Sequence, residues 1–349
     1  MELLTSDAPI LPAPHAVEES LSEPPPELVS DASGIQGPVG ILGAGGKMGL
    51  HVALMMRRAL DLAGRRDVPV VAVSRFSNRE TRDDFESRRI KTIAADLIEQ
   101  DALEKLPAFG SVFFLAGKKF GYDGDSRELT TFNRDMPLRV AERYRDATIV
   151  ALSTGCVYSF VRPGTGGSRE DDAIQPQGDY AESCHGREMA FADASVKHGT
   201  PTVIVRLNYA VEYRYGVLLD IARNVLAGTA VDVSMGYVNV IWQRDAVEHI
   251  LRARALAASP ARILNVAGVP IVSVREIAER FGQRFGKKPV ITGKEEADAW
   301  LNDASCSHRL FGPPNTPLDE MIALVAAWLA AGRTTREQPT KFETRDGKF

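Results

Sequence analysis

The 349-residue chain lacks most features that mark secreted, metal-binding, membrane or nucleic-acid-binding proteins. Its three cysteines form no CxxC pair, which argues against a disulfide framework and against a zinc site. No stretch approaches the ~18 consecutive apolar residues of a membrane-spanning helix, and the N-terminus has no basic-then-apolar leader. The net charge of −4 leaves no basic surplus for nucleic acid or anionic membrane. We therefore expect a cytoplasmic protein whose partner is a small molecule, without metal, nucleic acid or membrane.

Basic residues are also missing from the start of the chain. No Lys or Arg precedes Lys47, and residues 1–37 are acidic, with three consecutive prolines at 24–26. This composition favours a loosely ordered N-terminal extension. The alternative is an arm that packs on the domain or on a partner. Proline fits the first turn of a helix, so a short helix could begin near Pro26.

From residue 38 onward, short apolar runs alternate with segments of helical spacing. Six β-rich runs are bounded by turn residues: PVGIL, VPVVAVS, IKTIA, GSVFF, ATIVALS and PTVIVRL. Strands that alternate with helices predict an α/β fold with a doubly wound parallel sheet. After Asn208 the alternation loosens, which indicates a smaller C-terminal substrate-binding domain. The predicted dinucleotide domain spans 38–206 plus 241–266, and the substrate portion spans 207–240 plus 267–349.

A glycine-rich loop lies between the first predicted strand and the first long helix. In GILGAGGKMGLHVA, Gly43, Gly46 and Gly49 have GxxGxxG spacing. The first glycine permits a tight turn, the second lets the backbone approach a pyrophosphate, and the third lets the helix pack closely on the strand. The helix N-terminus offers free N–H groups to the phosphates. In this context the loop predicts a Rossmann dinucleotide site.

The ends of the second and third strands indicate which cofactor binds. NAD-binding proteins usually carry Asp or Glu after the second strand, bonded to the ribose hydroxyls. This chain has Ser74 and Arg75, and arginine can pair bidentately with a phosphate. We therefore favour NADP over NAD. Asp96, after the third strand, could reach the adenine or could cap a helix.

Further motifs follow in order: STGCVYS, YAESCHGRE, NVIWQRDAVEHIL and ILNVAGVPIVSVREIAERF. From about Val39 to about Leu329 the chain resembles the extended short-chain dehydrogenase/reductases of the NAD-dependent epimerase/dehydratase family, such as UDP-galactose 4-epimerase. The resemblance implies hydride transfer with NAD(P), with Tyr180 as acid/base and Thr154 as its partner. The implied substrate is a sugar, sugar acid or related hydroxy/keto compound. Further implied cofactor contacts are Lys47, Met48, Leu97, Ala116, Gly117, Lys119 and Tyr180.

The chain departs from the family pattern at its central cation. Cys184 stands where the YxxxK motif has its lysine, which lowers the tyrosine pKa and binds the nicotinamide ribose. A neutral thiol does neither, and we interpret Cys184 as a small apolar filler. We expect Lys118 or Lys119, just beyond the fourth strand, to replace the lost charge. Arg187 also lies on nearly the same helix face as Cys184, but a structural salt bridge, for example with Glu188, is the favoured explanation for it.

The substrate portion offers Asn208, Arg214 and Trp242 as candidate contacts. Arg214 could bind a carboxylate or phosphate, or it could form an interdomain salt bridge. Asn208 lies one residue earlier than the asparagine that holds the diphosphate in classical family members, which puts a nucleotide sugar in doubt. Another departure is Ser159, which replaces a glycine.

Two other functions remain open from the sequence. An NADPH-dependent ketone reductase would use Tyr180 and Thr154 as hydrogen-bond donors. A catalytically silent NAD(P)-binding sensor or scaffold would need neither residue, so their retention favours an enzyme.

The resemblance also predicts a homodimer formed by the helices around 128–145 and 180–199. Apolar residues of these helices exceed what one sheet face is expected to need. Examples are Phe132, Met136, Val140, Met189 and Phe191.

Overall fold

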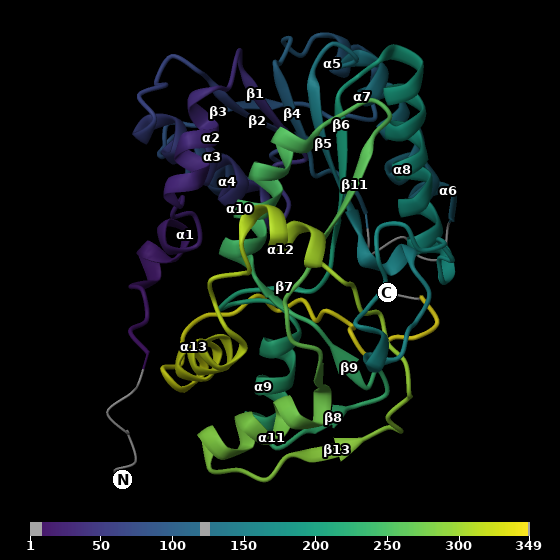
Figure 1. The fold of residues 1–349 in the computed structure, drawn as a ribbon. Coiled ribbons are helices and arrows are strands. Elements are labelled where there is room, and N and C mark those ends of the chain that lie inside the picture. The colour runs from purple at the N-terminus through teal and green to yellow at the C-terminus, as the bar shows by residue number, and fades with distance from the viewer. Residues whose placement is uncertain (1–8, 119–125, 348–349) are drawn as a thin grey trace.

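The structure is a computed structural model that describes residues 9–118 and 126–347. It has two lobes: a sheet flanked by helices, and a smaller lobe of helices and short strands (Figure 1). Within these residues, no helix is long and apolar enough to cross a bilayer.

The larger lobe is built on one seven-stranded sheet in the order β3-β2-β1-β4-β5-β6-β11, and every pair is parallel. The predicted doubly wound parallel sheet is confirmed. The strand order reverses between β1 and β4, the switch point at which open α/β sheets bind ligands. The strands are β1 (Val39–Leu42), β2 (Val70–Ser74), β3 (Lys91–Ala94), β4 (Ser111–Phe114), β5 (Thr148–Thr154), β6 (Thr202–Leu207) and β11 (Arg262–Val266).

Helices cover both faces of this sheet, as its continuous apolar strands require. One face packs against α2 (Pro26–Ser33), α3 (Gly49–Leu62) and α10 (Gln243–Arg252). The other face packs against α5 (Gln100–Glu104), α7 (Met136–Arg143) and α8 (Gly178–His198). The remaining helices of this lobe are α4 (Arg79–Glu86), α6 (Ser126–Thr130), a π-helical turn (Thr131–Asp135) that joins α6 to α7, and α12 (Ser305–Phe311).

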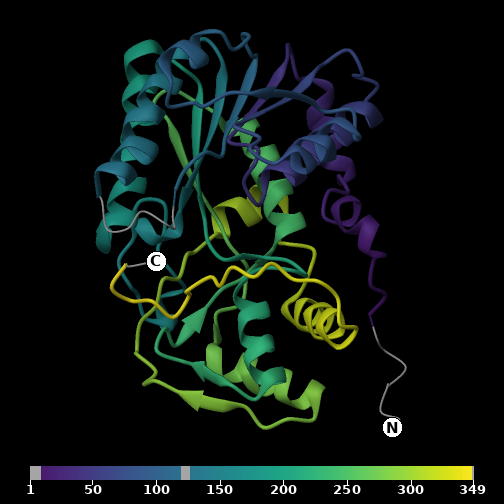
Figure 2. The same ribbon diagram turned by 180° about the vertical axis from the view of Figure 1, so that it is seen from behind.

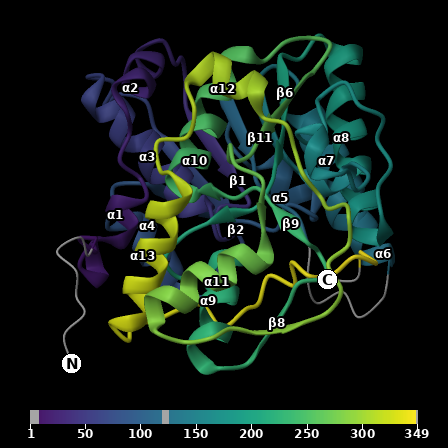
Figure 3. The same ribbon diagram turned by 60° about the horizontal axis from the view of Figure 1, so that its bottom comes forward.

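The smaller lobe has its own apolar core, which buries Trp242, Trp300 and Trp328. Three helices and three two-stranded sheets surround this core (Figures 2 and 3). The helices are α9 (Val217–Ala227), α11 (Val274–Phe285) and α13 (Leu318–Ala330). The strand pairs are β7 (Ala210–Val211) with β10 (Ile241–Trp242), β8 (Ala230–Asp232) with β13 (Val290–Thr292), and β9 (Tyr237–Val238) with β12 (Val272–Ser273).

The expectation of a loosely ordered N-terminal extension is wrong for residues 9–37. A short helix, α1 (Val17–Ser20), precedes α2, which begins at Pro26 as the sequence predicts. Glu18 of α1 accepts a hydrogen bond from His51 of the larger lobe and forms an ion pair with Arg214 of the smaller lobe. These two partners hold the pKa of the Glu18 carboxyl far below its usual range despite its burial. The arm therefore joins the two lobes.

The last part of the chain crosses the molecule as an extended tail, residues 334–347 (Figure 2). Arg345 donates to the backbone carbonyl of Asp298, 2.7 Å away. The tail ends against the start of α8, where the Cα of Gly347 would lie 2.9 Å from a Cβ placed on Gly178. The tail thus reaches the end of α8 that carries Tyr180.

Candidate functional site

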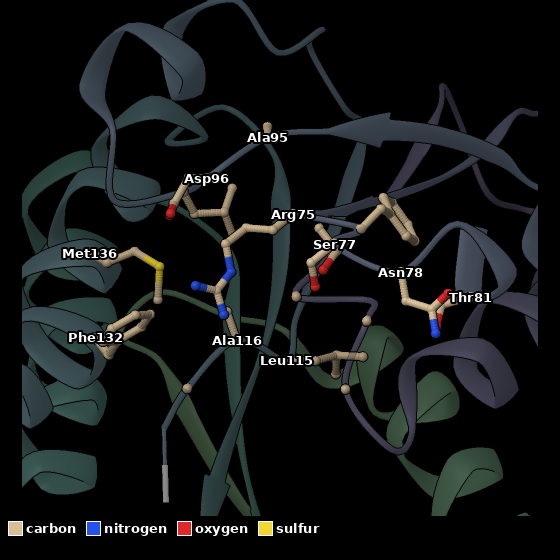
Figure 4. Close-up of a pocket in the computed structure, with 17 residues that line it drawn as sticks. Arg75, Ser77, Asn78, Thr81, Ala95, Asp96, Leu115, Ala116, Phe132 and Met136 are labelled. Atoms are coloured by element: carbon tan, nitrogen blue, oxygen red, sulfur yellow. The ribbon is translucent and has the colours of Figure 1, made fainter. Parts of the chain in front are cut away.

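A cavity of about 320 Å³ opens at the carboxyl ends of β1, β2, β3 and β4 (Figure 4). It lies at the switch point of the sheet, and the loops that follow these four strands form most of its lining. Eight of the predicted cofactor residues line it: Gly43, Gly46, Ser74, Arg75, Asp96, Leu97, Ala116 and Gly117. The cavity is therefore where the sequence places the dinucleotide.

The three glycines of the loop have different local roles. Gly43 has φ of 83°, and a Cβ there would lie 2.5 Å from the backbone of Ala116. A Cβ on Gly49 would lie 2.0 Å from the carbonyl oxygen of Ala44, so this glycine is needed for α3 to pack on the loop. Gly46 lines the cavity, and the nearest atom to its Cβ position is 3.5 Å away. Gly43 and Gly49 therefore serve the fold, whereas Gly46 leaves room for a ligand.

The β2 side of the cavity is rich in polar groups that can donate hydrogen bonds. Figure 4 shows Arg75 extending into the cavity, with Ser77, Asn78 and Thr81 beyond it and Asp96 on the opposite side. Arg75 is exposed, and no ion pair engages it within the described part of the chain. Asp96 accepts a hydrogen bond from the Ile98 N–H at 3.0 Å, so it also caps a local turn. The cavity offers an available guanidinium where NAD-binding proteins have a carboxylate.

Thr154 and Tyr180 are carried by the end of β5 and the first turn of α8. Thr154 Oγ1 accepts a hydrogen bond from the Cys156 N–H at 3.2 Å, which fixes the turn after β5. The Tyr180 hydroxyl is hydrogen-bonded to the thiol of Cys184 on the next turn of α8. Burial raises the pKa of Tyr180 well above its usual range, Cys184 and Cys156 raise it further, and Arg187 lowers it. In this state Tyr180 is a proton donor.

Cys184 is fully buried and packs with Val157 and Tyr158. Burial raises the pKa of its thiol, so the side chain is neutral at ordinary pH. This environment supports the interpretation of Cys184 as a small apolar filler.

The candidate replacement cations have different partners. Lys118 forms an ion pair with Glu128, and its ammonium lies 5.6 Å from the ring centroid of Phe132. Its charge is therefore already compensated. Lys119 lies outside the described residues. Arg187 is buried, and its guanidinium donates to the Asn133 side chain and to the carbonyl oxygen of Leu152, the latter at 3.0 Å.

Besides Gly49, three described residues among the predicted cofactor contacts lie outside the cavity lining. Lys47 places its ammonium 3.1 Å from the ring centroid of Tyr215, which belongs to the smaller lobe. Met48 packs against the core beneath α3. Tyr180 packs beside both the core of the smaller lobe and the Cys184 cluster.

The three predicted substrate residues have structural partners instead, and these expectations are corrected. Asn208 is 3% exposed and donates to Asn239 Oδ1 at 3.0 Å. Arg214 forms ion pairs with Glu18 and Glu212, which is the interdomain alternative. Trp242 is also 3% exposed and meets the ring of Tyr213 edge-on, with centroids 4.9 Å apart. Contacts of this kind satisfy each side chain within the protein.

A buried polar network fixes α8 against β5 and β6. Glu188 of α8 accepts hydrogen bonds from Ser153 at 2.5 Å and from Arg206 at 3.0 and 2.7 Å. Arg206 also donates to the hydroxyl of Tyr158, which in turn donates to Asn265 at 3.0 Å. Tyr158 is therefore a structural residue, and the Glu188 carboxylate is neutralised by Arg206.

The sequence reasoning missed much of the cavity wall. Phe132 and Met136 are four residues apart on the π-helical turn and α7, and π-helical turns are frequent at functional sites. Ser77 and Asn78 follow β2 directly, in the loop where ligands of this sheet type bind. The residues missed are Gly45, Phe76, Ser77, Asn78, Thr81, Ala95, Leu115, Phe132 and Met136.

Comparison with known proteins shows the fold. No family model matches the chain, and no curated protein matches it. MoeE5 in complex with UDP-glucose and NAD is 20% identical, covers 85% of this chain and 99% of its own, and has a TM-score of 0.68. UDP-glucuronic acid 4-epimerase from Bacillus cereus with NAD has 16% identity, 84% and 99% coverage, and a TM-score of 0.70. dTDP-glucose 4,6-dehydratase from Bacillus anthracis with NAD has 15% identity, 85% and 97% coverage, and a TM-score of 0.72.

Proposed function

We propose that the chain is an NAD(P)-dependent oxidoreductase or epimerase of the epimerase/dehydratase type, acting on a sugar, sugar acid or related hydroxy/keto compound. The cavity at the switch point carries this proposal, because Gly46 is open toward it and a cation stands at its β2 end. A dinucleotide fits this donor set, since the start of α3 and Arg75 both favour anionic oxygens. The ordered motifs and the fold of the three solved structures support the same class.

The chain's own residues have distinct tasks in this proposal. The bound nicotinamide would accept or donate the hydride. Tyr180 donates a proton to a developing alkoxide or removes one from a hydroxyl, and Thr154 orients the same oxygen. The partly buried position of Tyr180 limits the water that would compete for this proton.

A direct test begins with fluorescence or calorimetric titration of the protein with NAD, NADH, NADP and NADPH. A panel of free sugars, sugar acids and nucleotide-linked sugars is then screened by the absorbance of the reduced nicotinamide. A protein that binds none of the four dinucleotides would contradict the proposal.

A second candidate is a ketone reductase, and the raised pKa of Tyr180 favours it. A phenol that stays protonated is suited to protonating the oxygen of a ketone during reduction, and less suited to removing a proton from an alcohol. Reduction of ketones by the reduced cofactor, with no reverse reaction at neutral pH, would select this candidate.

Arg75 is expected to give the site a preference for NADP. Arg75→Ala should weaken NADP binding by about tenfold or more, because a charged hydrogen bond contributes about 1.5–3 kcal/mol, and should leave NAD binding nearly unchanged. The matched control is Arg79→Ala, since Arg79 is exposed and pairs with Asp83 on the next turn of α4. Calorimetric titration of both cofactors measures the difference. If NAD bound more tightly than NADP and its affinity did not change in Arg75→Ala, the preference for NADP would be contradicted.

We also propose that two copies associate through α7 and α8. Of the residues offered for this surface, Met136, Val140 and Phe191 are buried in the chain's own core, so they are not available for it. Met189 remains exposed, and the two helices also expose Leu138 and Val196.

Light scattering at micromolar concentration is expected to give twice the mass of one chain. Met189→Glu combined with Val196→Glu should give single chains, because both changes place charge on the apolar surface. The control is Leu62→Glu, an equally exposed leucine on α3. A monomeric parent protein would rule out the association.

A further inference from the structure

Arg187 is a buried cation that has no anionic partner among the described residues. Its side chain is buried, its guanidinium meets only the neutral oxygens of Asn133 and Leu152, and its Nε has no partner. The adjacent carboxylate, Glu188, is fully engaged by Arg206 and Ser153. Burying an unpaired charge costs free energy, so such a residue is retained where its charge has a use.

The position of this charge is at the edge of the cofactor cavity. A Cβ on Gly117 would lie 2.2 Å from Arg187 Nη2, so the guanidinium lies directly behind Gly117, which lines the cavity. Asn133 ties the guanidinium to the backbone beside Gly117. Its side-chain oxygen accepts hydrogen bonds from the Lys118 N–H, at 3.1 Å, and from Arg187. A side chain at position 117 would therefore displace the guanidinium from its present place.

Arg187 also lies on the helix face that carries the tyrosine. Tyr180, Cys184 and Arg187 are spaced by four and three residues along α8, which places them on one face. Cys184 lies between the other two and contributes no charge in its neutral form. The short thiol leaves the guanidinium as the nearest cation on this helix face.

We propose that Arg187 supplies the positive charge that the lysine of a YxxxK motif would provide, and that it stabilises the anion formed at Tyr180 during the proposed reaction. Arg187 is a positioning and charge-supplying residue, because it acts on Tyr180 across Cys184 rather than by touching substrate. This inference rests on the proposed function for its catalytic meaning, but the local electric field of Arg187 can be measured without cofactor or substrate.

The ionisable groups around Tyr180 and Cys184 define the test. Cys156, in the turn after β5, raises the pKa of both the Tyr180 hydroxyl and the Cys184 thiol, whereas Arg187 lowers both. Glu188 also raises the pKa of the thiol, but its carboxylate is paired with Arg206. Lys118, on the segment after β4, is paired with Glu128. Removing Arg187 therefore removes the cation that opposes the effect of burial.

The experiment uses Cys184 as a reporter in a Cys156→Ser, Cys306→Ser protein, where it is the last thiol. The ¹³Cβ chemical shift of labelled Cys184 is followed by NMR across pH, which requires no reagent to reach the buried thiol. The inflection of this titration reports the thiol pKa. Arg187→Gln should move the inflection upward by about one to two pH units. Arg187→Lys should keep it near the parent value. Arg134→Met, a matched change at an exposed arginine beside α8, should not move it.

A second measurement links the charge to Tyr180. In the pH profile of hydride transfer, Arg187→Gln should move the inflection that depends on Tyr180 to higher pH, and Cys184→Lys in that background should bring it back. Arg187→Met replaces Arg187→Gln in both measurements if the glutamine variant does not fold. An unmoved thiol inflection in the neutral variants would overturn the inference. A moved thiol inflection in a protein that binds no dinucleotide would instead overturn the proposed function alone.

Discussion

Gly46→Asp is expected to abolish dinucleotide binding while the protein stays folded. The aspartate would stand in the cavity against the pyrophosphate, and at about 5 Å in an effective dielectric near 20 the repulsion is about 3 kcal/mol per charge, more than a hundredfold in affinity. The fold has room for the side chain, because only the Gly43 carbonyl lies within 4 Å of the Cβ position. Titration with both cofactors, beside circular dichroism and thermal unfolding, separates binding from folding.

Two other glycines, Gly34 and Gly43, provide control variants for Gly46→Asp. Gly34→Asp makes the same change at a site with open space and no cavity, so it should leave binding intact. Gly43→Asp should destabilise the protein itself, because both its φ and the contact with Ala116 exclude a side chain. If Gly46→Asp bound cofactor as tightly as the parent, the loop would not be the pyrophosphate site.

Tyr180→Phe is expected to lower turnover by about a hundredfold or more, the usual effect of losing a positioned acid or base. Dinucleotide affinity should change much less, because the ring still packs beside Cys184. The rate of reduced-nicotinamide formation or consumption with the substrate found by screening measures the effect. Cys184→Ala should be nearly neutral in turnover.

Tyr158→Phe is the matched control for this change. Its hydroxyl accepts from Arg206 and donates to Asn265 within the buried network, so its loss should lower the free energy of unfolding and spare catalysis. A fully active Tyr180→Phe variant would mean that Tyr180 is not the acid/base. A variant of Lys118, such as Lys118→Met, should then be compared, because the catalytic roles expected for Lys118 and Lys119 remain predictions.

The parts of the fold that the sequence predicts are those set by short-range pattern. The apolar runs at 39–42 and 70–74 are bounded by turn residues and form central strands of the sheet. The glycine loop is predictable for the same reason. Gly43 and Gly49 are required by the local backbone conformation and by the close approach of neighbouring backbone atoms. Arg75 follows β2 directly, so its place at the cavity also depends only on local order.

The expectations that fail depend on partners far along the chain. Arg214 is engaged by Glu18, 196 residues earlier, and nothing in either segment alone reveals the pair. The acidic N-terminal arm orders because cations of α3 and of the segment after α4, such as Arg58 and Arg88, meet its carboxylates. Val140 and Phe191 are as apolar as an interface would need, but they are required by the sheet face beneath them.

The tail segment that packs against the start of α8 makes the surroundings of Gly347 a sensitive place for a reporter. Gly347 packs on Gly178, two residues before Tyr180. A fluorophore attached beside Gly347 would therefore sense changes in the packing around the start of α8. Fluorescence from such a label would follow any such change in real time, even for a compound that is bound but not converted. The same closeness leaves no room for a larger side chain at either glycine.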